Sequence, residues 1–182
     1  MLLDTPAAAI GRAMPDFTLR DPDGRAVTMS ERLGDKGLVV AFVCNHCPYV
    51  VAVAGRLARD ADLLAAEGIG TLAVMSNDWR DYAADSPPNM TRFAAEHGWR
   101  FPYLVDEDQS VGRAWGAVCT PDFFGLNAKG ELHYRGRLDD ARMTDAPDRQ
   151  RELVEAMRTI AETGTGPAAQ SPSMGCSVKW RD

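Results

Sequence analysis

The chain has 182 residues, of which 45% are hydrophobic and 25% are charged, and its net charge at pH 7 is −6. This length and composition predict one globular domain that buries its own core. The acidic balance, with scattered Lys and Arg, argues against a nucleic-acid-binding surface. No apolar run approaches the ~20 residues of a membrane span. Residues 1–14 make a poor signal peptide, so we expect a cytoplasmic protein that does not bind membranes.

The predicted elements begin with a β-hairpin and then alternate between strand and helix. Turn residues at 21–24 separate two short strands, and a valine-rich run at 38–43 predicts a strand buried on both faces. Apolar residues at helical spacing predict the first long helix. In chain order we expect a hairpin over 16–28, a helical turn at 30–33, a strand at 38–43, a helix at 49–66 and a strand at 69–75.

The second half of the chain continues the alternation. We expect a helix at 90–96, a strand at 103–105, a short helix at 110–115, a hairpin of strands 122–126 and 132–137, and an amphipathic helix at 147–162. This order implies an α/β domain with a mixed, mainly parallel sheet covered by helices on both faces. The Gly-, Pro- and Ser-rich composition after residue 163 predicts an irregular tail. We therefore divide the chain into a domain at 1–163 and a tail at 164–182 that carries Cys176.

Two cysteines, Cys44 and Cys47, follow the buried strand directly, and Pro48 comes next. Proline is acceptable in the first turn of a helix, because its missing N–H would have no partner there. Unpaired N–H groups and the positive end of the helix macrodipole favour a thiolate at such a junction. We therefore predict a thiol–disulfide centre, in which the more exposed Cys44 attacks a substrate disulfide and Cys47, one turn further in, resolves it.

Other interpretations of the pair remain open. Free cysteines are often small buried hydrophobic residues without chemistry. A zinc site would need about four ligands, and the sequence shows no second Cys/His pair at ligand spacing, so we expect no metal and no bound cofactor. A copper-binding module that uses the two thiolates, with His46, is a non-enzymatic alternative, because soft thiolates favour Cu(I).

Two further residues could take part in the chemistry. His46 lies between the cysteines and could donate a hydrogen bond to the Cys44 thiolate or place positive charge beside it, which predicts a lowered pKa for Cys44. The alternative is a loop histidine without a role. Cys176 is either a resolving cysteine on a flexible segment or an unpaired thiol on a disordered tail.

These residues resemble the thioredoxin-fold redoxins, the group that contains thioredoxin-like oxidoreductases and the thiol-specific antioxidant proteins. The similarity runs from about residue 11 to residue 137. It includes the opening at residues 14–19, the Cys-Asn-His-Cys motif at residues 44–47 and the Thr120-Pro121 dipeptide. The Cys-Asn-His-Cys-Pro motif, together with the end of the chain around Cys176, is similar to an uncharacterised peroxiredoxin-like subfamily.

The resemblance implies a thioredoxin-like fold in which Thr120-Pro121 forms the cis-proline loop that faces the cysteine pair. A cis X–Pro bond is a minority state that folded proteins keep for a structural reason. The backbone before this proline can pair with an extended substrate strand, so Thr120 and Pro121 are expected to bind substrate. On the same loop, Cys119 is either a third redox thiol near Cys44 or a small buried residue at a tight turn.

The chain also departs from the family patterns. Thioredoxins carry Trp immediately before the first cysteine and a buried acid six residues before it, whereas this chain has Val43 and Leu38 there. The typical peroxidatic motif, Pro-x-x-x-Thr-x-x-Cys, is absent. We expect a thiol–disulfide oxidoreductase that cycles a Cys44/Cys47 dithiol and disulfide, with a thiol-dependent peroxidase as the alternative. The expected partners are a protein or small-molecule disulfide, or a peroxide, and a thiol reductant, and the protein is expected to be a monomer or homodimer.

Overall fold

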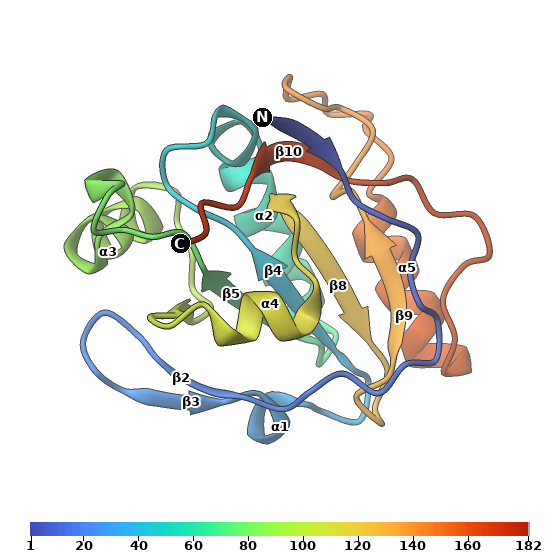
Figure 1. The fold of residues 1–182 in the computed structure, drawn as a ribbon. Coiled ribbons are helices and arrows are strands. Elements are labelled where there is room, and N and C mark those ends of the chain that lie inside the picture. The colour runs from blue at the N-terminus through green and yellow to red at the C-terminus, as the bar shows by residue number, and fades with distance from the viewer. Residues whose placement is uncertain (182) are drawn as a thin grey trace.

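The computed structural model describes residues 1–181 as two sheets with helices packed around the larger one (Figure 1). The strands are β1 (Leu2–Asp4), β2 (Thr18–Arg20), β3 (Ala26–Thr28), β4 (Leu38–Phe42), β5 (Gly70–Met75), β6 (Tyr103–Val105), β7 (Cys119–Thr120), β8 (Asp122–Leu126), β9 (Leu132–Gly136) and β10 (Met174–Ser177). The helices are α1 (Met29–Arg32), α2 (Pro48–Ala66), the 3-10 turn η1 (Ala83–Asp85), α3 (Pro87–Glu96), α4 (Ser110–Trp115) and α5 (Glu152–Thr163).

The larger sheet has the strand order β3-β2-β6-β5-β4-β8-β9. It is mixed and starts with the N-terminal hairpin β2–β3, as the sequence predicted. The prediction of a mainly parallel sheet is wrong, because parallel pairing joins β4 to β5 and β5 to β6, whereas β8 and β2 pair antiparallel with β4 and β6. The reason is that hairpins form both edges of the sheet, and a strand joined to its neighbour by a short turn must run antiparallel to it.

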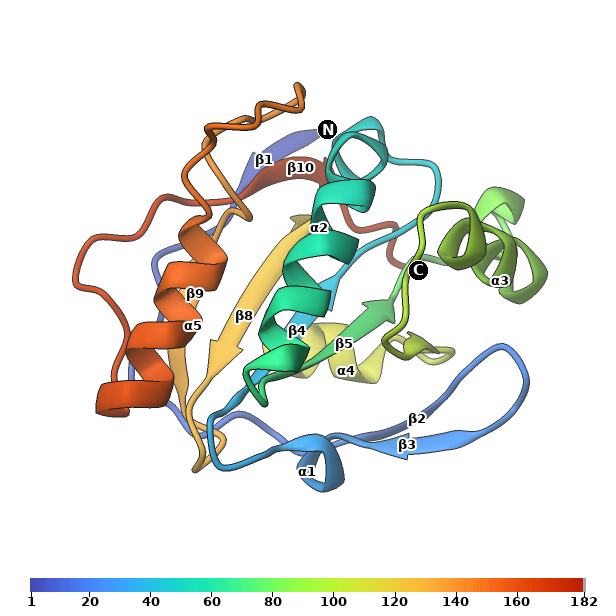
Figure 2. The same cartoon turned by 180° about the vertical axis from the view of Figure 1, so that it is seen from behind.

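The central strand β4 separates two apolar cores. Val39 and Ala41 point into a core shared with α2 and α5, whereas Val40 and Phe42 point into a second core that contains Trp115 of α4. Helices therefore cover both faces of the sheet, with α4 on one face and α2 and α5 on the other (Figures 1 and 2). Of the helices described, none has the length and apolar character needed to cross a lipid bilayer.

The smaller sheet has the order β1-β10-β7 and joins the two ends of the described chain. In Figure 1 it crosses the end of the molecule where α2 begins. We expected residues 164–182 to be irregular, and this is wrong for β10, because backbone pairing with β1 on one side and β7 on the other fixes it as a strand. The flanking residues Ser173 and Val178 are buried, so this part of the tail is docked on the domain.

A buried ion cluster ties α2 to the segment that precedes α5. The Asp139 carboxylate accepts hydrogen bonds from Arg56 Nε at 2.8 Å and from Arg149 Nη1 at 2.9 Å. Arg149 Nη2 also donates to Asp60 at 2.6 Å. Since buried charges are tolerated only when they are paired and hydrogen-bonded, this cluster holds α2 against the segment that precedes α5.

Candidate active site

The junction between β4 and α2 carries the two predicted redox cysteines. Strand β4 ends at Phe42 and α2 starts at Pro48, so Cys44 lies in the connecting loop and Cys47 is the residue that caps the helix N-terminus. Both sulfurs face the loop that contains the cis bond between Thr120 and Pro121. Cys44 Sγ lies 3.3 Å from Thr120 Oγ1, and Cys47 Sγ lies 3.2 Å from the Thr120 carbonyl oxygen. The structure thus brings these four predicted site residues together.

Both cysteine side chains of the pair are closed off from solvent. Cys44 is 1% exposed and Cys47 is 0% exposed, so the expectation of a more exposed Cys44 is wrong. Cys44 follows the central strand of the sheet, and Cys176 of β10 packs against the apolar cluster that contains both cysteines. In this conformation neither sulfur of the pair is therefore accessible to a reaction partner in solvent.

The thiolate is favoured at Cys47 rather than at Cys44. The pKa of Cys47 is lowered to about 4, chiefly because the Cys44 thiol hydrogen-bonds to its sulfur, with the side chain and backbone N–H of Cys176 adding to the effect. Its place at the positive end of α2 acts in the same direction. The pKa of Cys44 is raised by its hydrogen bond to Cys47, by burial and by the nearby Asp85 carboxylate. The predicted lowering at Cys44 is therefore reversed.

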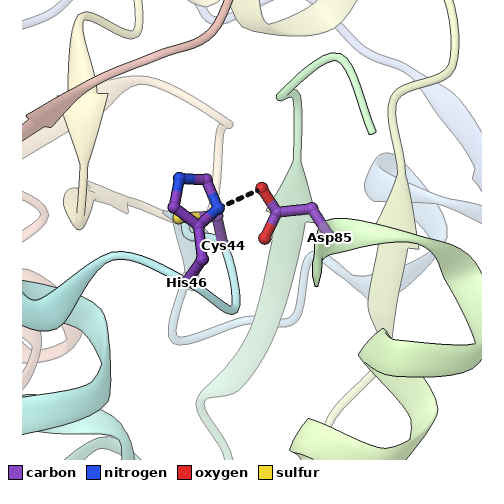
Figure 3. A group of neighbouring side chains, drawn as sticks. All are labelled: Cys44, His46 and Asp85. Carbon is purple, nitrogen blue, oxygen red and sulfur yellow. Dashed lines mark hydrogen bonds and ion pairs between the residues drawn. The ribbon is translucent and has the colours of Figure 1, made fainter. Parts of the chain in front are cut away.

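A buried acid, Asp85 of η1, stands next to the cysteine loop (Figure 3). Its Oδ1 accepts a hydrogen bond from the Asn45 backbone N–H at 2.7 Å. Its Oδ2 accepts hydrogen bonds from His46 Nδ1 at 2.7 Å and from Asn77 Nδ2 at 2.9 Å. Three donors thus hold the carboxylate in place, and its negative charge is felt at Cys44.

His46 is oriented by Asp85 and not by the thiols. Its ring stacks on Tyr82 with 5.5 Å between the ring centroids, and Nδ1 points at the carboxylate (Figure 3). Within residues 1–181 no hydrogen bond joins His46 to Cys44, so of the two roles that we considered for His46 beside this thiol, hydrogen-bond donation is not formed. Single ligand atoms of Cys44, His46 and Asp85 nevertheless lie within 4.8 Å of one another, a set of thiolate, imidazole and carboxylate that could hold a metal ion.

Asp85 is the site residue that the sequence analysis missed. It lies 40 positions after Asn45, in a polar loop without a recognisable motif, and only the tertiary fold brings the two together. The one signal in the sequence is indirect. Leu38 occupies the position of the acid that thioredoxins bury, which leaves the proton-transfer partner of the cysteine pair to be sought on another element.

The remaining two cysteines are placed very differently. Cys119 is buried, its thiol donates to the Pro121 carbonyl at 3.6 Å, and burial raises its pKa to about 12. Neighbouring residues of a strand face opposite sides, so Cys119 faces away when Thr120 faces the pair. Cys176, in contrast, pairs directly opposite Thr120, and its thiol interacts with Cys47.

Comparisons with known proteins identify the family and the fold of the chain. The Redoxin family matches residues 9–153. The crystal structure of an uncharacterised conserved protein from Geobacillus kaustophilus has 37% sequence identity and a TM-score of 0.92, covering 100% of this chain and 97% of that one. Peroxiredoxin Bcp of Escherichia coli (strain K12) is 28% identical over 131 residues, 72% of this chain and 78% of its own. Thiol-disulfide oxidoreductase ResA of Geobacillus thermodenitrificans is 26% identical over 129 residues, 69% of this chain and 68% of its own.

These likenesses confirm the α/β thioredoxin-like fold that the sequence motifs implied. Both Bcp and ResA are distant, and their names point to two different thiol reactions. What they share is redox chemistry at cysteine, which is the function of the family as a whole. The narrower resemblance to a Cys-Asn-His-Cys-Pro subfamily stays a prediction. The chain belongs to the Redoxin family, and its function is thiol-based redox chemistry.

Proposed function

We propose that the protein is a thiol–disulfide oxidoreductase that cycles Cys44 and Cys47 between dithiol and disulfide, with Cys47 as the attacking thiolate. The main support is the geometry of the pair, in which Cys47 caps the N-terminus of α2 and both sulfurs lie against Thr120. The pKa of Cys47 is lowered in this position, with the Cys44 thiol beside it. Disulfide exchange needs a thiolate to attack and a second thiol to resolve. Relative to our expectation from sequence, the roles of the two cysteines are exchanged.

The reaction runs in two steps. The Cys47 thiolate attacks one sulfur of the substrate disulfide, a mixed disulfide forms, and the first substrate thiolate leaves. Cys44 then loses its proton and attacks the Cys47 sulfur, so the Cys44–Cys47 disulfide forms and the second substrate thiolate leaves. The His46–Asp85 pair, with ligand atoms within 4.8 Å of the Cys44 sulfur, is placed to accept that proton through one water molecule. The substrate gains the two electrons that the dithiol loses.

The partners of this cycle are a disulfide as oxidant and a thiol as reductant. A bound disulfide would lie against Thr120 and Pro121 in the place that β10 occupies, because both sulfurs of the pair contact Thr120 and β10 pairs with that residue. The disulfide belongs to a protein or to a small molecule, and a thiol returns the pair to the dithiol. No bound cofactor takes part in either step.

The test is reduction of insulin disulfides in the presence of dithiothreitol, followed by turbidity, with a small disulfide assayed in parallel. Cys47→Ser and Cys44→Ser are expected to fall to the rate measured without protein. Cys119→Ser is the matched control, since this thiol faces away from the pair, and it should keep the wild-type rate. Full activity of Cys47→Ser on both disulfides would refute the proposal.

A thiol-dependent peroxidase is the second candidate, favoured by the likeness to the peroxiredoxin Bcp. Here the Cys47 thiolate attacks a peroxide oxygen, the O–O bond breaks, and a sulfenic acid forms on Cys47. A neighbouring thiol then forms a disulfide with Cys47 and releases water. Consumption of hydrogen peroxide coupled to a thiol reductant, without insulin reduction, would favour this candidate. Stoichiometric copper with neither activity would instead identify a metal-binding module.

A further inference from the structure

The backbone position beside Thr120, where a substrate strand is expected to pair, is filled by the chain's own strand β10 (Figure 1). Cys176 pairs with Thr120 on one side and with Leu2 of β1 on the other. Gly175 makes this close approach possible, because a Cβ atom there would lie 1.9 Å from the Thr120 carbonyl oxygen. Cys176 is thus held in register where a substrate strand would present its own cysteine.

Several contacts place the Cys176 thiol against Cys47. The carbonyl oxygen of Thr120, the residue that pairs with Cys176, lies 3.2 Å from Cys47 Sγ. Cys176 packs on the apolar cluster that contains Cys44 and Cys47. Cys176 is also close enough to act on Cys47 electrostatically, since its side chain and backbone both help to lower the pKa of Cys47. Cys47 therefore has one thiol neighbour from the cysteine loop and another from β10.

The three thiols differ in how far solvent reaches them. Cys44 and Cys47 are fully buried, whereas Cys176 is partly exposed. Thiol–disulfide exchange requires the attacking thiolate to reach a sulfur of the disulfide. A disulfide between Cys44 and Cys47 is therefore shielded from an external thiol, and Cys176 is the neighbouring sulfur that such a thiol can reach.

We propose that Cys176 is the catalytic thiol through which the buried pair exchanges with external reductant. This inference rests on the proposed function of Cys47. In the oxidised protein the Cys176 thiolate attacks the Cys47 sulfur of the Cys44–Cys47 disulfide. The Cys47–Cys176 bond forms, the Cys44–Cys47 bond breaks, and Cys44 leaves as a thiolate that takes up the proton that Cys176 gave away. The disulfide moves to β10 with no net gain or loss of electrons.

Reduction then occurs at the exposed sulfur. A low-molecular-weight thiolate attacks Cys176, and Cys47 leaves as a thiolate, which is a good leaving group because its pKa is low. A second external thiolate attacks the external sulfur of the resulting mixed disulfide and releases the Cys176 thiolate. Two external thiols are oxidised to one disulfide, and the protein gains two electrons.

The experiment maps the disulfides of oxidised protein after an acid quench and measures the rate of its reduction by glutathione. Wild type should yield a Cys47–Cys176 peptide pair. Cys176→Ser should yield Cys44–Cys47 and be reduced at least tenfold more slowly. Cys119→Ser, on the strand that pairs with β10, is the matched control and should resemble wild type in both measurements. Cys44→Ser, which leaves β10 untouched, should still form the Cys47–Cys176 disulfide.

The outcomes separate this inference from the proposed function. If the Cys47–Cys176 bond is missing from both wild type and Cys44→Ser, or if Cys176→Ser is reduced at the wild-type rate, the inference is overturned while the Cys44/Cys47 cycle stands. If Cys47→Ser still exchanges disulfides, the proposed function itself fails. Thermal unfolding of Cys176→Ser beside wild type checks that β10 remains docked in the variant.

Discussion

Two buried carboxylates, Asp139 behind α2 and Asp85 beside the sulfurs, are stabilised in different ways. Asp139 lies between two guanidinium groups, those of Arg56 and Arg149. Asp85 accepts its hydrogen bonds from a backbone N–H, from the Asn77 amide and from the His46 imidazole. Within residues 1–181 no Arg or Lys forms an ion pair with it. Both side chains are buried, so the difference lies in the partners and not in exposure.

The comparison shows how the fold separates stability from reactivity. A guanidinium cancels most of the field of the carboxylate that it contacts, so the Asp139 cluster acts mainly as a structural tie. Uncharged donors hold a carboxylate in place without cancelling its charge. The pKa of Cys44 is raised chiefly by its hydrogen bond to Cys47 and that of Tyr103 by burial, and the Asp85 charge adds to both shifts. The Asp139 charge adds in the same way to the raised pKa of Tyr134. The following variants test whether Asp139 acts on stability and Asp85 on the thiols, beginning with the largest expected effect.

Asp139→Ala should lower the free energy of unfolding by about 3–5 kcal/mol, because removing one partner of a buried ion pair leaves an uncompensated charge. The titration of the cysteines should not change, since the cluster is separate from the sulfurs. Urea unfolding measures the first effect, and thiolate absorbance at 240 nm measures the second. A loss below about 1 kcal/mol would show that Asp139 does not stabilise the packing of α2 against the segment that precedes α5.

Cys44→Ala should raise the pKa of Cys47 by at least two units, or about 3 kcal/mol, because the largest favourable hydrogen bond to the thiolate is lost. In wild type the 240 nm absorbance of one thiolate should appear as the pH rises through about 4 and persist at higher pH. In the variant the same step should appear at higher pH. Cys119→Ala should leave the wild-type step in place, and a shift there would contradict the assignment.

Asp85→Asn should lower the pKa of Cys44 by about one unit, or ~1.4 kcal/mol, because it removes the nearby negative charge and keeps the side-chain size. The measurement is the rate at which Cys44 is alkylated at each pH, followed by mass spectrometry in a Cys119→Ser, Cys176→Ser background, because a lower pKa gives a larger thiolate fraction at every pH. An unchanged rate would show that the Asp85 charge does not act at the sulfur. The low-pH step of Cys47 serves as the internal reference.

Arg59→Ala should have the smallest effect. Arg59 and Asp145 form an ion pair at 2.7 Å, but their side chains are 54% and 60% exposed. Water screens such pairs, so we expect no measurable change in the free energy of unfolding. A loss comparable to that of Asp139→Ala would mean that ion pairing alone, and not burial, sets the stability of this region.

The parts of the fold that follow a local pattern were predictable from sequence. The apolar run of β4, the helical spacing of α2 and the hairpin β8–β9 all appear where their residues indicate them. Pro48 at the first position of α2 was also a readable sign that Cys47, and not Cys44, caps the helix. The predicted exposure of Cys44 failed because exposure depends on what the rest of the chain places over the loop.

The parts that depend on distant partners were not predictable in this way. The residues of β10 lack an alternating apolar pattern, and their pairing with β1 and β7 makes them a strand. The last helix was predicted from residue 147 but begins at Glu152. Arg149 explains the difference, because its side chain is drawn into the buried cluster with Asp60 and Asp139 and holds this stretch outside the helix.

The bare backbone of Gly175 makes one experiment possible that no cysteine variant offers. An alanine methyl at this position would act as a wedge between β10 and the Thr120 carbonyl oxygen, which a Cβ atom would approach to 1.9 Å. Such a protein keeps every sulfur but misaligns them. Its rate of disulfide exchange would show how much of the reaction depends on the presence of the three thiols and how much on the correct pairing of β10 with Thr120.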